Sequence, residues 1–130
     1  MSELSQAQLH MIEERLEARE RELQSRVRAA KEAAAERPSA QGPQVEDLGE
    51  GGEQRFRHGM EHVEMLRDQE ELADIADARA RIADGSYGEC IDCGQPINFD
   101  RLVAQPTAKR CIVDQEAWEK KHGTTLRYTA

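Results

Sequence analysis

The chain has 130 residues, of which 34% are charged and only 4% aromatic, and its formal net charge is −8. This composition is typical of long helices and coiled coils. A core so poor in aromatic residues needs additional stabilisation, such as a bound metal ion. The acidic balance argues against the phosphate backbone of DNA as the main partner, because nucleic-acid binders carry a basic surface.

The sequence has no apolar run of about 18 residues that could span a membrane, and its start lacks the pattern of a signal peptide. The chain contains three cysteines. An odd number of cysteines without an export signal indicates a reducing compartment, with metal-bound or free thiols rather than disulfides. We therefore expect a cytoplasmic protein.

Residues 5–37 are predicted to form one long helix, because they are rich in Ala, Glu, Arg, Gln and Leu. Their larger apolar residues recur at spacings of three, four and seven, which is typical of the narrow seam of a coiled coil. Pro38 then ends the helix. The apolar stripe consists of Leu9, Ile12, Leu16, Leu23 and Val27, followed by Ala30 and Ala34.

Residues 38–53 are predicted to form a loop, which we call the tip. Its first part, Pro-Ser-Ala-Gln-Gly-Pro, cannot continue a helix. Residues 45–53 contain four acids, three glycines and no base, which indicates an exposed acidic segment.

A second helix is predicted for residues 54–83, with Gly85 after its end. If the two helices fold back antiparallel about a centre near residue 45, the numbers of facing residues add up to about 90. Arg19 to Arg21 would then face Gln69 to Glu71 in one polar layer. The alternative is that each helix pairs with another chain in a dimer. The second apolar stripe consists of Phe56, Met60, Val63, Leu66, Leu72, Ile75, Ala78 and Ile82.

The spacing of apolar residues changes after Gly85. The remaining residues predict a small globular head with a short helix over 114–122 and Gly123 as its cap. The fold class is therefore mainly α, with a long antiparallel coiled-coil hairpin (1–84), a zinc-ribbon-like head (85–123) and a tail (124–130). The expected core of the head consists of Ile91, Ile97, Phe99, Leu102, Val103, Ile112 and Trp118.

All three cysteines lie in the head, and their spacing indicates a zinc site. Cys90 and Cys93 form a Cys-x-x-Cys pair, and Cys111 follows after 17 intervening residues. A four-cysteine site would place its last thiolate at position 114. Asp114 stands there instead, and a carboxylate oxygen also binds zinc.

Two alternatives stay open at this point. The fourth ligand could be His122 or a water molecule, or the cysteines could pack without metal as small apolar residues. Three thiolates and a carboxylate would leave a negative site, which Lys109 and Arg110 are placed to offset. No Glu or His stands near the site at a spacing typical of a catalytic base, so we expect no enzyme and no catalytic residues.

The head resembles the DksA/TraR family of zinc-finger transcription regulators, and the similarity covers about residues 46–122. The string Arg-Leu-x-Ala-x-Pro-Thr-Ala followed by a cysteine is far more specific than Cys-x-x-Cys alone. The matching residues are Tyr87, Gly88, Cys90, Cys93, Gly94, Ile97, Arg101, Leu102, Ala104, Pro106, Thr107, Ala108 and Cys111.

The resemblance implies a monomer that binds bacterial RNA polymerase and inserts its coiled-coil tip into the secondary channel. Family members modulate initiation in this way, often together with guanosine tetraphosphate at the shared interface, and they do not recognise DNA sequence. Full-length members carry Asp-x-x-Asp-x-Ala at the tip, which falls here on Asp47, Glu50 and Gly52. Glu50 keeps the charge with one more methylene, whereas Gly52 loses the methyl group.

The sequence therefore predicts a stringent-response type of regulator with Asp47 and Glu50 as effector acids and a structural zinc site at Cys90, Cys93, Cys111 and Asp114. One alternative is a relative that binds polymerase but only competes with the full regulator. Another is a small zinc-binding or thiol-redox protein with no polymerase contact.

Overall fold

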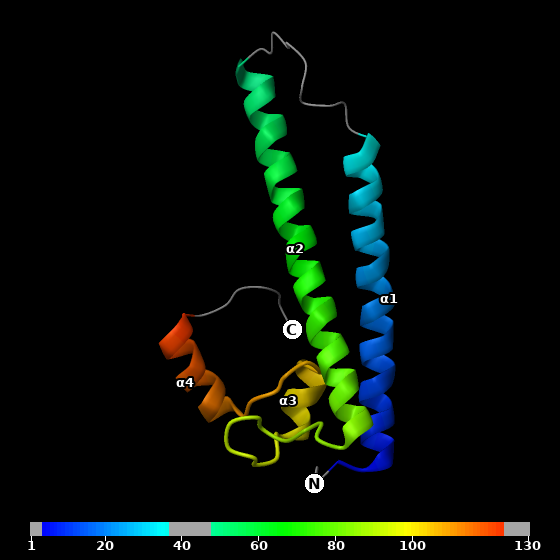
Figure 1. Cartoon of the computed structure of the whole chain (residues 1–130), viewed down its shortest axis with the longest axis vertical. Coiled ribbons are helices and arrows are strands. Elements are labelled where there is room, and N and C mark those ends of the chain that lie inside the picture. The colour runs from blue at the N-terminus through cyan, green and yellow to red at the C-terminus, as the bar shows by residue number, and fades with distance from the viewer. Residues whose placement is uncertain (1–3, 37–47, 124–130) are drawn as a thin grey trace.

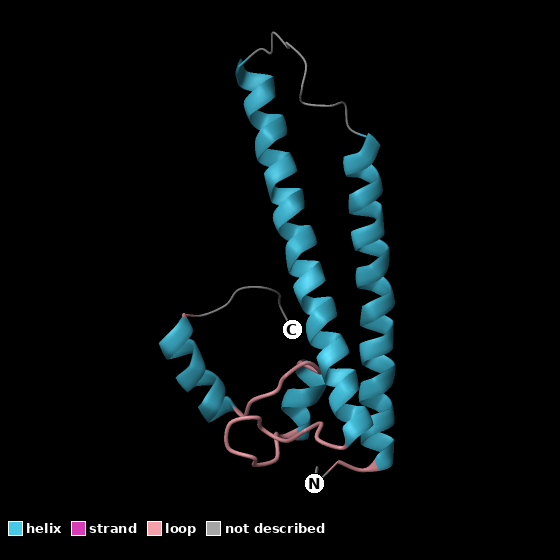
Figure 2. Ribbon diagram, viewed as in Figure 1, coloured by secondary structure: helices cyan, strands magenta, loops and turns pink. Residues whose placement is uncertain are grey.

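A computed structural model of the chain describes residues 4–36 and 48–123, with side chains given for all of these except 48–56 and 58. Four helices account for most of this part, and Figures 1 and 2 show two of them forming a long antiparallel hairpin with a small head at its base. The described residues form no strand, only an isolated antiparallel bridge between Glu89 and Pro96. No described helix combines the length and the apolar character needed to cross a membrane.

Helix α1 (Gln6–Glu36) has 31 residues and is about 46 Å long. It begins with a reciprocal cap. The Gln8 backbone N–H donates to Ser5 Oγ at 3.1 Å, and the Ser5 backbone N–H donates to Gln8 Oε1 at 2.9 Å. This capping box satisfies two backbone donors that the helix itself leaves without partners. The start near residue 5 therefore agrees with the prediction.

Helix α2 (Leu48–Asp84) begins earlier than the expected Gln54, so residues 48–53 are helical rather than part of a loop. Extending a helix that already exists adds one hydrogen bond per residue without a new nucleus, which offsets the cost of the glycines there. Gly85 ends α2 with a φ of 84°. The Ser86 backbone N–H then donates to the Arg81 carbonyl oxygen at 2.9 Å, as in a Schellman cap.

The base of the hairpin has the predicted register. Arg19 Nε donates to Glu71 Oε2 at 2.6 Å and Arg19 Nη2 donates to Glu71 Oε1 at 2.9 Å, across the expected polar layer. The carboxylate holds the pKa of Arg19 above its usual range, with burial acting in the opposite direction. Ile12, Leu16 and Ile75 are fully enclosed or nearly so, as expected for seam residues.

The half of the hairpin near the tip differs from the prediction. Met60, Val63 and Leu66 were expected in the seam, but they are 46%, 41% and 46% exposed. The side of α2 that faces α1 there carries Met65 and Asp68, and Arg26 Nη2 lies 3.0 Å from Asp68 Oδ1. The buried Asp68 thus takes the seam position in an ion pair with Arg26, and α2 is rotated so that the three apolar side chains point outward.

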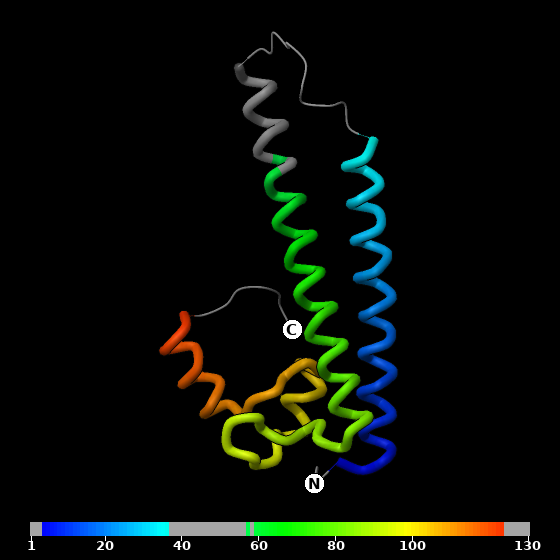
Figure 3. Tube along the Cα trace, viewed as in Figure 1, coloured from blue at the N-terminus to red at the C-terminus, as the bar shows by residue number. Residues whose placement is uncertain are grey.

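The helices lie farther apart toward the tip, as the trace in Figure 3 also shows. Between them is a cavity of about 430 Å³. Alanines of α1 line one side of it, and these small side chains cannot fill the space between the helices. The alanines are Ala29, Ala30, Ala33 and Ala34.

The contrast between two leucines tests this rotation. Leu23→Ala is expected to lower the free energy of unfolding by about 2–5 kcal/mol, because Leu23 is 0% exposed. Leu66→Ala removes the same atoms from a side chain that is 46% exposed. This substitution should change the free energy of unfolding by less than about 0.5 kcal/mol. Urea unfolding followed by circular dichroism measures both. If both variants lost the same free energy of unfolding, the predicted pairing of Leu23 with Leu66 would be correct.

The head (residues 85–123) shares one hydrophobic core with the base of the hairpin. Tyr87, Ile97 and Leu102 from the head belong to the same buried cluster as Leu16 and Ile75 from the hairpin. The head is therefore built directly onto the hairpin, and Figure 1 shows helix α3 (Phe99–Ala104) lying beside the base of α2.

Helix α4 (Ile112–His122) is attached differently, because it has no buried residue. It stands away from the hairpin in Figure 1. Two residues expected in the core of the head are exposed, Ile91 at 50% and Ile112 at 56%. Both directly follow a cysteine of the group Cys90, Cys93, Cys111 and Asp114.

Candidate metal centre

Residues 90–93 form a tight turn, which we call the knuckle. The Cys90 backbone N–H donates to the Gln95 carbonyl at 2.8 Å, and the Gly94 N–H donates to the Cys90 carbonyl at 2.9 Å. Gly94 has a φ of 76°, which side-chain-bearing residues rarely adopt. The knuckle thus places the Cys90 and Cys93 thiols on the same side of the turn.

The other two donors come from the start of α4. Cys111 is the N-cap residue of this helix and Asp114 lies in its first turn. The Gln115 backbone N–H donates to the Cys111 carbonyl at 2.8 Å, which closes that turn. The Ile91 N–H donates to the Lys109 carbonyl at 2.9 Å and joins the knuckle to the segment before Cys111.

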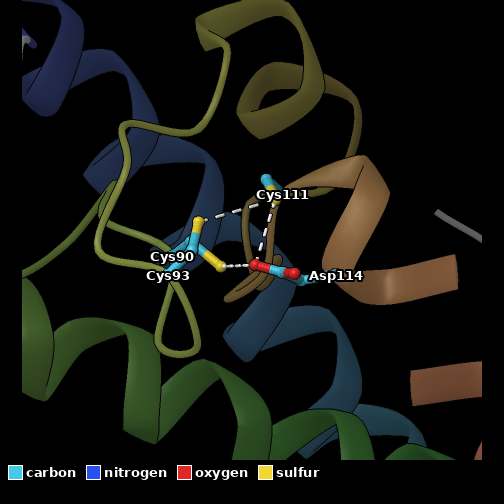
Figure 4. Close-up of side chains that lie close together, drawn as sticks. All are labelled: Cys90, Cys93, Cys111 and Asp114. Carbon is cyan, nitrogen blue, oxygen red and sulfur yellow. Dashed lines mark hydrogen bonds between the residues drawn. The ribbon is translucent and has the colours of Figure 1, made fainter. Parts of the chain in front are cut away.

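The four side chains converge, as Figure 4 shows. Their ligand atoms all lie within 4.8 Å of one another. Asp114 Oδ2 is 3.0 Å from Cys90 Sγ and 3.3 Å from Cys111 Sγ, and the Sγ atoms of Cys93 and Cys111 are 3.9 Å apart. A tetrahedral zinc site, with its usual bond lengths, separates two sulfurs by about 3.8 Å and a sulfur from an oxygen by about 3.5 Å. The donor set therefore fits a structural zinc ion.

The charge of the cluster also suits a cation, because the Asp114 carboxylate is held in its ionised form. Hydrogen bonds from the three thiols hold the pKa of Asp114 below its usual range, with the charge of Arg110 acting in the same direction. The backbone N–H of Gln95 lowers the pKa of Cys93, but Asp114 and the neighbouring thiols outweigh it and raise that pKa to about 12. The Cys93 thiol thus keeps its proton beside the carboxylate until a metal ion displaces it. Burial and Asp114 raise the pKa of Cys90, but hydrogen bonds from backbone N–H groups outweigh them and hold that pKa below its usual range.

Burial differs among the four donors. Cys90 is only 3% exposed, Cys111 and Asp114 are half-buried, and Cys93 is exposed. The site is therefore anchored in the core of the head at Cys90 and open to solvent at Cys93. Thiolates held in this way favour zinc over harder divalent ions such as Mg²⁺.

His122, the alternative fourth ligand, does not join the cluster. Its ring stacks on Trp118 with centroids 4.6 Å apart, and its Nδ1 lies 3.0 Å from the Trp118 carbonyl oxygen. Among the candidates from the sequence, the structure brings Asp114 to the three thiols.

The predicted tip residues are only partly covered by the structure. Asp47 lies outside the described residues. Glu50 and Gly52 lie in the first turns of α2, where the backbone alone is described. The expectation of a loop over residues 38–53 is therefore corrected from Leu48 onward, and the role of the three residues stays a prediction.

Sequence reasoning did not identify the residues that surround the metal ligands. Arg110 Nε donates to Asp92 Oδ2 at 2.8 Å, and the Arg110 guanidinium lies 5.0 Å from the centre of the Trp118 ring. The sequence indicated only that Lys109 and Arg110 are basic neighbours of Cys111. No spacing rule separates the two, because the contact to Trp118 depends on where α4 points.

Comparisons with known proteins agree with the site. Residues 85–115 match the family model described as the prokaryotic dksA/traR C4-type zinc finger. The RNA polymerase-binding transcription factor DksA of Caulobacter vibrioides is 42% identical over 50 residues, in strains NA1000 / CB15N and ATCC 19089 / CIP 103742 / CB 15 alike. That match spans 38% of this chain and only 35% of each relative.

The likeness to a solved structure extends over the hairpin as well as the head. The transcription factor DksA2 from Pseudomonas aeruginosa is 31% identical to the chain, with a TM-score of 0.73. The match covers 92% of this chain and 89% of that one, so it includes both parts of the molecule. The chain therefore belongs to the DksA/TraR zinc-finger family.

Proposed function

We propose that the chain is a transcription regulator that binds bacterial RNA polymerase and inserts the tip of its hairpin into the secondary channel. The observation that carries this proposal is the likeness to DksA2 over 92% of the chain, which includes the hairpin as well as the zinc finger. The Caulobacter relatives are named as RNA polymerase-binding proteins. Binding polymerase would place the protein in the bacterial cytoplasm.

The shape and charge of the molecule are compatible with this role. Helix α1 alone gives the hairpin a length of about 46 Å, enough to enter a deep channel. The net charge of −8 disfavours direct binding to DNA and suits a partner with a basic surface. Because α1 and α2 pair within one chain, we expect the protein to act as a monomer.

The zinc site would hold the base of this hairpin in a fixed geometry. Zinc would join the knuckle to the start of α4, and Cys90 of the knuckle belongs to the core shared with the hairpin. The ion thus stabilises the fold and takes no part in chemistry. In this proposal Asp47 and Glu50 would act at the far end, and guanosine tetraphosphate would bind where the head meets the polymerase.

A second role, binding polymerase only to compete with a full regulator, is favoured by one observation. Glu50 and Gly52 replace an Asp and an Ala of the family's tip motif. A longer carboxylate side chain reaches a different position, and the glycine lowers the stability of the first turns of α2 by about 1 kcal/mol. Both substitutions would weaken a tip that has to meet a defined partner.

A pull-down tests the shared part of both roles. The tagged full chain is expected to retain the polymerase subunits from a bacterial lysate at moderate salt. Purified polymerase should then compete with the polymerase of the lysate for the same chain. If neither source of polymerase is retained, both roles are refuted and a zinc-binding or thiol-redox protein without polymerase contact remains.

A further inference from the structure

Arg110, which directly precedes the ligand Cys111, is well enclosed, since its side chain is only 12% exposed. Its Nε donates to Asp92 Oδ2 at 2.8 Å, and Asp92 lies inside the knuckle between the two cysteines. Its guanidinium also lies over the ring of Trp118 at 5.0 Å. The side chain therefore contacts the knuckle and α4 at once.

The backbone of Arg110 is held in place as well. Arg101 Nε, from α3, donates to the Arg110 carbonyl oxygen at 3.1 Å. Arg110 thus connects three segments of the head: α3 through its backbone, the knuckle through Asp92 and α4 through Trp118.

Helix α4 has few other attachments. It has no buried residue, and Ile112 and Val113 in its first turn are 56% and 73% exposed. Asp114 is carried by this same turn. The position of the fourth ligand therefore depends on how α4 is held, and Arg110 supplies a side-chain contact for that purpose.

We propose that Arg110 is a positioning residue for the metal site, which holds α4 in the orientation where Asp114 meets the three thiols. The proposal concerns the head alone and does not depend on polymerase binding. A carboxylate needs such support more than a thiolate does. Its side chain offers oxygen in several directions, and residues around a metal ligand commonly orient it.

Lys109 provides a control that separates the positioning role of Arg110 from the effect of its positive charge. A divalent ion with three thiolates and a carboxylate carries a net charge of about −2, and either basic residue would offset part of it. No ion pair or ring contact of the Lys109 side chain is found among the described residues. Lys109→Met therefore removes the same charge one residue away without removing the contacts to Asp92 and Trp118.

The test is the zinc affinity of the full chain, measured by competition with a chromophoric chelator. Arg110→Met is expected to weaken zinc binding by about 10- to 100-fold, as is usual when a residue supporting a metal ligand is lost. Arg110→Lys keeps the charge but lacks the planar guanidinium, and should still lose about tenfold. Lys109→Met should change the affinity by less than about threefold, because it removes a charge of the same sign but none of the contacts to Asp92 and Trp118.

A double-mutant cycle shows whether Arg110 acts through Asp114. In an Asp114→Ala background, Arg110→Met is expected to change zinc affinity by less than about threefold, because the positioned ligand is gone. Emission of Trp118, the chain's one tryptophan, gives a second readout. It should move to longer wavelength in zinc-loaded Arg110→Met, since the contact over the ring is lost.

Four results would overturn the proposal. Equal losses in Arg110→Met and Lys109→Met, or full affinity in Arg110→Lys, would show that charge alone acts. An undiminished loss in the Asp114→Ala background would show that Arg110 supports the fold of the head without acting on the fourth ligand. Unchanged affinity in Arg110→Met would show that α4 is held by other contacts.

Discussion

The chain carrying Cys90→Ser is expected to purify with less than about a tenth of an equivalent of zinc and with an unfolded head. Cys90 is 3% exposed and its Sγ lies 3.0 Å from Asp114 Oδ2, so it is the buried anchor of the donor set. A serine hydroxyl stays protonated at neutral pH and is a poor zinc ligand. Structural zinc contributes roughly 10–16 kcal/mol of apparent binding free energy to small zinc domains, so its loss unfolds them.

Elemental analysis and circular dichroism measure this outcome. Most of the helical signal should persist, because α1 and α2 contain 31 and 37 residues and α4 only 11. Ala108→Ser is the matched control, since it places a hydroxyl at another buried position of the head, 5% exposed, without touching a ligand. A full equivalent of zinc in Cys90→Ser would contradict the assignment of the site.

The double variant Asp47→Asn with Glu50→Gln is expected to bind polymerase with little change in affinity and to lose most of its effect on initiation. This prediction rests on the proposed function, together with the expectation from the family resemblance that the tip reaches toward the magnesium-containing catalytic centre of the polymerase. Removing both charges should reduce the effect at least tenfold, because interactions with a metal-bound site depend on charge. Transcription from a ribosomal RNA promoter, with and without guanosine tetraphosphate, measures it.

The control for this variant is Glu46→Gln with Glu53→Gln. It removes the same charge from the same segment but leaves the two motif positions intact. It should keep its effect on initiation. Inhibition that survives the Asp47 and Glu50 changes would mean that the acids are not the effectors, and would favour the competitor role.

The hairpin was largely predictable because two helical stripes with matching spacing leave few ways to pair. Arg19 and Glu71 meet as the register requires, at 2.6 Å. The prediction failed near the tip, where the buried carboxylate of Asp68 takes the seam position and pairs with Arg26. A stripe of apolar residues does not reveal that a charged residue will occupy the seam in its place.

The metal site was predictable from the spacing of its cysteines. A knuckle provides two thiols three residues apart, and the start of a helix provides two more donors at the same spacing. Asp114 was identified by position, and the structure brings it to the three thiols. The contacts of Arg110 were not predictable. They depend on the direction of α4, which is set by packing between distant segments rather than by local sequence.

The most direct test of the proposed function replaces the catalytic magnesium of bound polymerase with Fe²⁺, which generates hydroxyl radicals at the active centre and cleaves nearby chains. With the end-labelled chain bound, cleavage is expected within residues 38–53. Asp47→Asn with Glu50→Gln should be cleaved in the same place, since these variants still bind. Cleavage confined to the head (residues 85–123), or none in a chain that stays bound, would contradict insertion of the tip.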